Sequence, residues 1–181
     1  MRLKSSSTAV AALAVSLPDG AALRTFRLLP AGRFHAADGS GRPAEVADGW
    51  RLDAADAAHL VAQSAGLASK RVIDYEHQTL LSADNGKPAP AAGFFQKLEA
   101  RGDGLYAVDV EWTAQAAAMI QAGEYRYISP VFAYDKRTGQ VLAIAHAALT
   151  NNPGLDGLTD LARLSAHLFP DEGESPMKEL I

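Results

Sequence analysis

A histidine between two carboxylates, a serine and a second histidine are the residues of this sequence best suited to chemistry. Residues 74–78 read Asp-Tyr-Glu-His-Gln and contain His77. Ser129 lies in an aromatic, strand-like run, and His146 lies in the next strand-like run, 141–149. A hydroxyl group is a weak nucleophile until an adjacent base takes its proton, and that base needs a group that orients it. A serine and two histidines can fill these three roles, so the sequence indicates a candidate serine hydrolase.

The neighbours of Ser129 favour a role as nucleophile over that of a small residue in an aromatic strand. Tyr, Ile, Pro and Val surround it and would form a dry wall, in which electrostatic stabilisation of an oxyanion is stronger. Pro130 cannot donate to a sheet ladder, so we expect Ser129 at a sheet edge or beside a bulge, where a substrate strand could approach. The G-x-S-x-G elbow of the α/β-hydrolases is absent from this segment.

The two histidines differ in their expected surroundings. Asp74 and Glu76 bracket His77, and a nearby carboxylate favours the imidazolium that forms when histidine accepts the serine proton. His146 lies among Ile, Ala and Leu, so it fits either a buried core histidine or a third site member that orients His77. Asp74, Glu76 and His77 could instead be metal ligands, but the sequence has no H-E-x-x-H motif and no second histidine at ligand spacing. A metal-dependent hydrolase is therefore the weaker alternative.

Composition limits the classes of protein that fit. With 181 residues the chain is expected to form one compact domain with tails, and 48% apolar residues are enough for a core. A formal net charge of −4 argues against a nucleic-acid-binding protein. The lack of cysteine removes disulfides, thiol catalysis and cysteine-ligated zinc.

The start of the chain superficially resembles a signal peptide, because a basic stretch precedes the apolar run 8–17. That run is alanine-rich and ends at the turn 18–20 without an A-x-A cleavage site, so we expect a first β-strand there. No run approaches the roughly 20 apolar residues that span a bilayer, and no membrane partner is expected.

Periodicity and turn residues predict a strand-rich fold with few helices. Strands are predicted at 8–17, 25–29, 70–75, 93–99, 104–112, 125–134 and 140–150, helices at 53–66, 114–122 and 156–168, and loops at 35–49 and 82–92. Hairpins join most of these strands, whereas strict strand–helix alternation would indicate a parallel sheet. The expected class is therefore α+β, with a mainly antiparallel sheet or barrel and flanking helices.

Five segments together resemble a known family, that of the bacteriophage Mu I proteins, the head-maturation proteases of Mu-like phages and prophages. The segments are residues 72–78, 88–93, 104–107 with 111–113, 124–132 and 148–153, and the resemblance runs from about residue 25 to 160. It implies a serine endopeptidase that cleaves the capsid scaffold and itself during head maturation. It further implies scaffold and capsid proteins as partners, no cofactor, no nucleic acid, and a location inside the prohead in the host cytoplasm.

The sequence is more distantly similar to the herpesvirus assemblins and phage prohead proteases. Assemblins use a Ser-His-His triad in the chain order His–Ser–His, which corresponds here to His77, Ser129 and His146. This resemblance implies a closed antiparallel barrel with helices around it, and a homodimer. The short spacing between Ser129 and His146 leaves Glu76 and Asp74 as alternatives for the third role.

The end of the chain differs in composition from the rest. Residues 169–181 are acidic, contain proline and glycine, and are predicted to form a flexible linker that leads toward a scaffold region, which leaves residues 1–168 as the protease domain. In the resembling family the reading frame continues into a scaffold protein that can also start internally, and Met177 is a plausible start. The alternative function is a catalytically inactive scaffold or structural component of the prohead.

Overall fold

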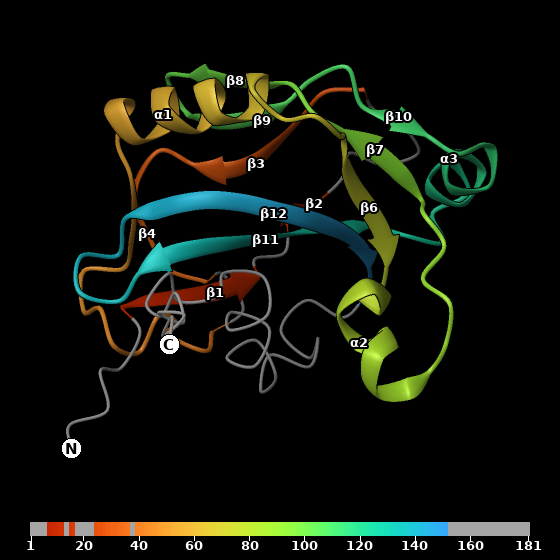
Figure 1. The fold of residues 1–181 in the computed structure, drawn as a ribbon, viewed down its shortest axis with the longest axis horizontal. Helices are drawn as coiled ribbons and strands as arrows, with labels where there is room; N and C mark the ends of the chain where they lie inside the picture. Colours follow the sequence, from red (N-terminus) through yellow and green to blue (C-terminus); the bar gives the residue numbers. More distant parts are fainter. Residues whose placement is uncertain (1–6, 13–14, 17–23, 37–38, 152–181) are drawn as a thin grey trace, which may run out of the picture.

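A seven-stranded sheet is the centre of the fold and carries the candidate site residues (Figure 1). The computed structural model describes residues 7–12, 15–16, 24–36 and 39–151 of the 181-residue chain. The order along the large sheet is β1-β11-β12-β6-β7-β10, with β2 beside β11. Its strands are β1 (Thr8–Ala12), β2 (Val15–Ser16), β6 (Arg71–Tyr75), β7 (Gly93–Phe95), β10 (Glu111–Trp112), β11 (Tyr127–Asp135) and β12 (Val141–Thr150).

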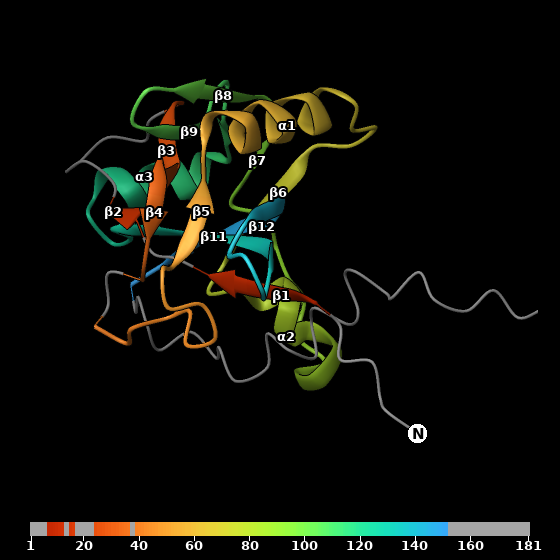
Figure 2. The ribbon, with the colours of Figure 1, turned by 90° about the vertical axis from the view of Figure 1, so that its left-hand side faces the viewer.

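The large sheet is open, so the closed barrel implied by the assemblin resemblance is not what the described residues form. Strands β1 and β10 lie at opposite ends of the strand order, and no pairing joins them in the described part of the chain. After β7 the chain leaves this sheet and adds β8 and β9 to a second one, ordered β3-β9-β8, which stacks on one face of the first sheet and does not extend it (Figure 2). The predicted α+β class is confirmed in its coarser form, a strand-rich structure whose described residues form three helices.

The second layer covers one face of the large sheet (Figures 1 and 2). It comprises the sheet of β3 (Phe26–Pro30), β8 (Leu98–Arg101) and β9 (Gly104–Ala107), the pair β4 (Gly32–Phe34) and β5 (Trp50–Leu52), and helix α1 (Ala54–Ala65). The core between these layers contains large side chains with almost no solvent exposure, among them Leu28, Trp50, Leu60, Ile73, Phe95 and Phe132. Each such side chain contributes about 1.5–3 kcal/mol by leaving water.

Both internal helices predicted from capping residues are confirmed. Helix α1 begins after Asp53, which shares a capping box with Asp56, and ends at Gly66. Helix α3 (Ala114–Gln121) begins after Thr113, whose hydroxyl accepts the N–H of Ala116. In each case a side-chain oxygen satisfies a backbone donor that the first helical turn leaves unpaired.

The segment predicted as a loop at 82–92 is partly helical. Helix α2 (Gln78–Asn85) extends from the end of β6 and ends at Gly86, whose φ of 66° is in the left-handed region. None of its residues is buried, so it has no apolar stripe from which periodicity could reveal it.

The hairpin predicted from 93–99 and 104–112 is split between two sheets. Strands β8 and β9 pair with each other, whereas β7 and β10 pair in the large sheet. The second arm breaks after β9, where Asp109 adopts a left-handed φ of 52°. This bend carries the chain from one layer to the other.

The predicted helix at 156–168, the tail 169–181 and the turn 18–20 lie outside the described residues. Within the described residues, no helix has the length and apolar character needed to cross a bilayer.

The packing predicts unequal costs for two leucine substitutions in and beside α1. Leu60 is 0% exposed, whereas Leu67 is 38% exposed. Leu60→Ala is expected to lower the free energy of unfolding by about 2–5 kcal/mol, because a cavity replaces packed atoms. Leu67→Ala is expected to change it by no more than about 0.5 kcal/mol. Urea denaturation of both variants measures the difference, and equal costs would contradict the position of α1 against the core.

Candidate active site

Three neighbouring strands place Asp74, Ala148 and Ser129 in one row across the large sheet. Strand β12 pairs in parallel with β6, aligning Ala148 with Asp74, and pairs antiparallel with β11, aligning Ala148 with Ser129. Side chains of aligned residues point to the same face of a sheet. Ile73, which precedes Asp74, belongs to the core between the layers. The row therefore lies on the opposite face, away from α1.

Of the two positions expected for Ser129, the structure shows the one near a bulge. Strand β11 is interior, because β12 pairs along one side of it and β1 and β2 pair along the other. The pairing with β12 shifts register between Val131 and Phe132, close after Pro130. The edge position is wrong because β1 and β2, which both fall within the single strand predicted at 8–17, pair along that side of β11.

His77 reaches this face of the sheet through a left-handed turn. After β6 ends, Glu76 and His77 have φ angles of 53° and 56°, a conformation that costs a residue with a side chain of order 1 kcal/mol or more. Three hydrogen bonds hold the turn: Glu76 N–H to Leu149 O at 2.9 Å, Thr150 Oγ1 to Glu76 Oε2 at 3.0 Å, and Thr79 N–H to Asp74 Oδ2 at 2.7 Å. The turn sends the imidazole back toward β11.

The imidazole and the serine hydroxyl meet at hydrogen-bond distance. His77 Nε2 lies 3.0 Å from Ser129 Oγ, although the residues are 52 positions apart. Ser129 is 2% exposed and His77 3% exposed. In the tautomer with the proton on Nδ1, Nε2 accepts the hydroxyl proton, which is the geometry required of a general base. Low exposure strengthens this interaction, because little water competes for either group.

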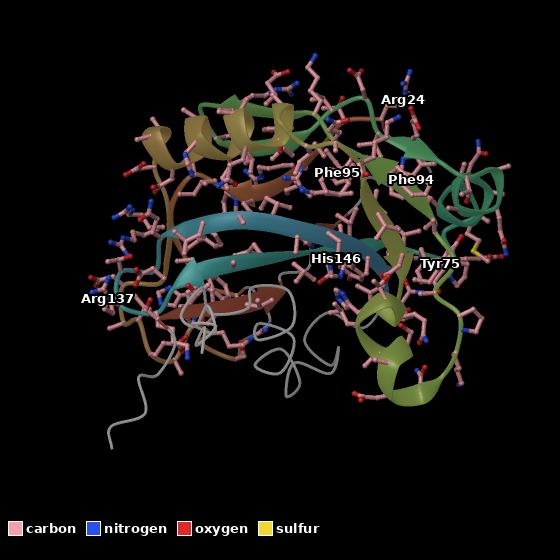
Figure 3. All side chains as sticks on the ribbon, in the orientation of Figure 1. Arg24, Tyr75, Phe94, Phe95, Arg137 and His146 are labelled. Carbon is pink, nitrogen blue, oxygen red and sulfur yellow. The ribbon has the colours of Figure 1, made fainter. Side chains whose placement is uncertain are left out.

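His146, labelled in Figure 3, lies on β12, and its ring is close to that of His77. The ring centroids of His146 and His77 are 6.5 Å apart, with an angle of 72° between the ring planes. That separation exceeds the distance at which two ring nitrogens share a hydrogen bond. His146 is 5% exposed, and its Nε2 has no hydrogen-bond partner among the described residues. Burial, and secondarily the nearby His77, lower the pKa of His146 to about 4, so the ring is neutral at pH 7.

The two carboxylates that the sequence left as alternatives have different environments. The Glu76 carboxylate accepts the hydroxyl of Thr150. Asp74 is fully buried and accepts the N–H of Thr79. Burial raises the pKa of Asp74, against the opposing effects of the Thr79 hydrogen bond and the nearby His77. In the described ranges, no group of three or more His, Asp or Glu side chains has the arrangement of a metal site.

Two features of the site were not predicted from the sequence. Ala148 separates Asp74 from Ser129, and Thr150 binds the carboxylate of the turn. Both depend on the parallel register of β6 and β12, strands that are distant along the chain and give no local signal of their pairing. The segment 148–153 contains both Ala148 and Thr150 and contributes to the family resemblance. It was the feature of the sequence that drew attention to this part of the chain.

A buried hydroxyl on β11 and an imidazole from the turn after β6 converge here, which is the arrangement of a candidate nucleophile and base. Residues 26–162 match the family model described as the Mu-like prophage I protein, N-terminal domain. This chain belongs to that family, which confirms the resemblance seen in the sequence.

Two curated relatives support the family assignment. The chain is 43% identical to Protease I of Escherichia phage Mu over 166 residues. The aligned residues cover 86% of this chain and 45% of that protein. It is 38% identical to the Mu-like prophage FluMu I protein of Haemophilus influenzae over 181 residues. This alignment covers 95% of this chain and 48% of that protein. The chain thus spans about half the length of these relatives. No solved structure matches it.

The buried, neutral state of His146 predicts a specific loss of stability in acid. Between the ordinary pKa of 6.5 and the folded value of about 4, the unfolded chain binds a proton that the folded chain excludes. The free energy of unfolding therefore falls as the pH drops through this window, by up to about 3 kcal/mol. His146→Asn is expected to remove this contribution when urea denaturation is measured from pH 7.5 to pH 4.

The matched control for this measurement is His59→Asn. His59 is an exposed histidine of α1 whose ring contacts Gln63. This variant is expected to keep the wild-type pH dependence. A wild-type slope in His146→Asn would show that the buried ring does not exclude the proton.

Proposed function

We propose that this chain is the protease portion of a phage serine endopeptidase, with Ser129 as nucleophile, His77 as general base and His146 as the group that orients His77. The observation that carries the proposal is the 3.0 Å distance between His77 Nε2 and Ser129 Oγ in a buried setting. The relative named Protease I supports a peptidase role. The contact between Ser129 and His77 supports the first and second roles, and the position of His146 near His77 supports the third.

The geometry supports an acyl-transfer mechanism. Ser129 Oγ attacks the peptide carbonyl carbon while its proton passes to His77 Nε2, and the resulting imidazolium then gives that proton to the leaving amine. Water attacks the acyl-enzyme in the second half of the reaction, again with His77 as base. Positioned general-base action of this kind contributes roughly 10²–10⁴-fold to the rate.

The proposed substrates are the capsid scaffold protein and the protease itself, cut during head maturation inside the prohead in the host cytoplasm. Capsid proteins are the proposed assembly partners, and a homodimer is the proposed oligomeric state. These assignments rest on membership of the Mu-like family and on the resemblance to prohead proteases.

Labelling by a serine-directed fluorophosphonate tests the nucleophile. Attack by Ser129 Oγ forms a P–O bond and releases fluoride, which adds a fixed mass to the chain. Wild type is expected to be labelled, and Ser129→Ala is expected to show no labelling and an unchanged circular dichroism spectrum. The control is Ser82→Ala, which changes a different serine, located on α2. This variant is expected to label like wild type. Labelling that persists in Ser129→Ala would refute the assignment.

Incubation of the purified chain tests whether the site cleaves peptides. Wild type is expected to lose mass from its C-terminal tail by self-cleavage, and Ser129→Ala is expected to retain it. A wild-type chain that neither labels nor cleaves would favour the alternative function, a structural component of the prohead.

Removal of the base is expected to slow labelling without abolishing the fold. His77→Ala deletes the acceptor for the Ser129 proton, so the rate of fluorophosphonate labelling is expected to fall by about 10²–10⁴-fold. Mass spectrometry over a time course measures this rate. A rate within a factor of two of wild type would show that His77 is not the base.

A further inference from the structure

Asp74 is a buried carboxyl group beside the candidate site to which the mechanism above gives no role. Its side chain is 0% exposed. Oδ2 accepts the Thr79 N–H, whereas Oδ1 is buried without a hydrogen-bond partner among the residues that the structure describes. A buried carboxylate with an unsatisfied oxygen is costly unless a positive charge lies close to it. A nearby group that becomes positive would stabilise the charged form of Asp74.

Asp74 also fastens the turn that presents His77. Residue His77 stands at the N-cap position of α2 but makes no capping hydrogen bond with its side chain. The Asp74 carboxylate performs this task from the end of β6, since it accepts the N–H of Thr79 in the first helical turn. A carboxylate at a helix N-terminus is also favoured by the helix dipole. The left-handed conformation of Glu76 and His77 is thus bracketed by a strand on one side and a capped helix on the other.

Asp74 and Ser129 lie on the same face of the large sheet. They are two strands apart, about 10 Å, with the small Ala148 between them. His77 follows Asp74 by three residues, in the turn after β6, and its Nε2 contacts Ser129, so His77 connects the end of β6 to β11.

Two carboxylates, those of Asp74 and Glu76, lie close to His77 along the chain, and Asp74 is the fully buried one. Ser129 faces His77 from β11, and His146 faces it from β12 as a neutral ring at pH 7. The carboxylate of Glu76 accepts the Thr150 hydroxyl and is only partly buried, so water screens its charge more than that of Asp74. Asp74 interacts electrostatically with His77 in the direction that favours its own charged form.

We propose that Asp74 is a positioning residue of the site, which holds the His77 turn in place and stabilises the imidazolium that forms when His77 takes the Ser129 proton. This inference rests on the proposed function and assigns the electrostatic support to Asp74, while His146 orients the ring. A positive imidazole would also provide the charge that the buried, unsatisfied Oδ1 atom requires.

The test is the pH dependence of fluorophosphonate labelling in Asp74→Asn. The amide oxygen of asparagine can still accept the Thr79 N–H, but the negative charge is lost. Labelling at the pH plateau is expected to be slower by roughly tenfold or more. The pH at which labelling reaches half its maximum is expected to fall by about one unit, because a carboxylate no longer stabilises the protonated base. A midpoint equal to that of wild type overturns the inference, even if the plateau is lower.

The matched control is Asp56→Asn, which removes another buried carboxylate near a helix N-terminus. Asp56 contacts Arg51 and Gln140 from α1, in the layer on the other face of the large sheet. This variant is expected to lose stability but to keep the wild-type midpoint. A shift of equal size in Asp56→Asn would show that the change in Asp74→Asn is unspecific, and would also overturn the inference.

A measurement on the wild-type chain decides the matter if Asp74→Asn does not fold. The ¹³C resonance of the Asp74 carboxyl group is expected to show an inflection at the same pH as the labelling midpoint, since protonation of the neighbouring imidazole changes its environment. A carboxyl resonance that is flat at that pH overturns the inference. Labelling that persists in Ser129→Ala refutes the proposed function instead. In that case the pH dependence of the Asp74 carboxyl resonance is compared with that of the His77 ring resonances, and this comparison tests the role of Asp74 by itself.

Discussion

The parallel pairing of β6 with β12 is the constraint on which the site depends. It aligns Asp74 with Ala148, and the antiparallel pairing of β12 with β11 then aligns Ala148 with Ser129. A shift of one residue in either register would send Asp74 or Ser129 to the core face, because side chains alternate along a strand. The pairing also fixes where β6 ends, and so where the turn that carries His77 begins. The chemistry of the chain is therefore set by a long-range backbone contact before any side chain is considered.

The site concentrates features that would destabilise an ordinary part of a fold. Two successive residues have left-handed backbones, and three titratable side chains, Asp74, His77 and His146, are almost completely buried. The tightly packed layer on the other face of the sheet offsets these costs, with Ile73 of the same strand fully buried in it. Strained and buried polar groups persist only where the surrounding structure holds them, and this arrangement is typical of functional sites.

The sequence predicted those parts of the structure that have a local cause. Helices α1 and α3 were predicted because Asp53 and Thr113 are capping residues, and the β11–β12 hairpin because both arms alternate around a turn. Helix α2 was missed since it buries none of its residues. The split of the 93–112 hairpin was missed because it depends on pairing with distant strands: β7 pairs with β6 in the large sheet, whereas β9 pairs with β3 in the second sheet. The convergence of His77 and Ser129 was anticipated from residue types and family resemblance, whereas the row through Ala148 requires a register that no local pattern encodes.

The low exposure of Ser129 and His77 has a consequence for kinetics. A peptide bond has to approach the hydroxyl oxygen closely before any bond can form, yet these two side chains are only 2% and 3% exposed. Access thus requires some displacement of the groups that cover them. Under the proposed function, turnover is then the intrinsic rate multiplied by the fraction of molecules in which the hydroxyl is accessible. Anything that changes this fraction would alter the turnover while leaving the reacting atoms themselves unchanged.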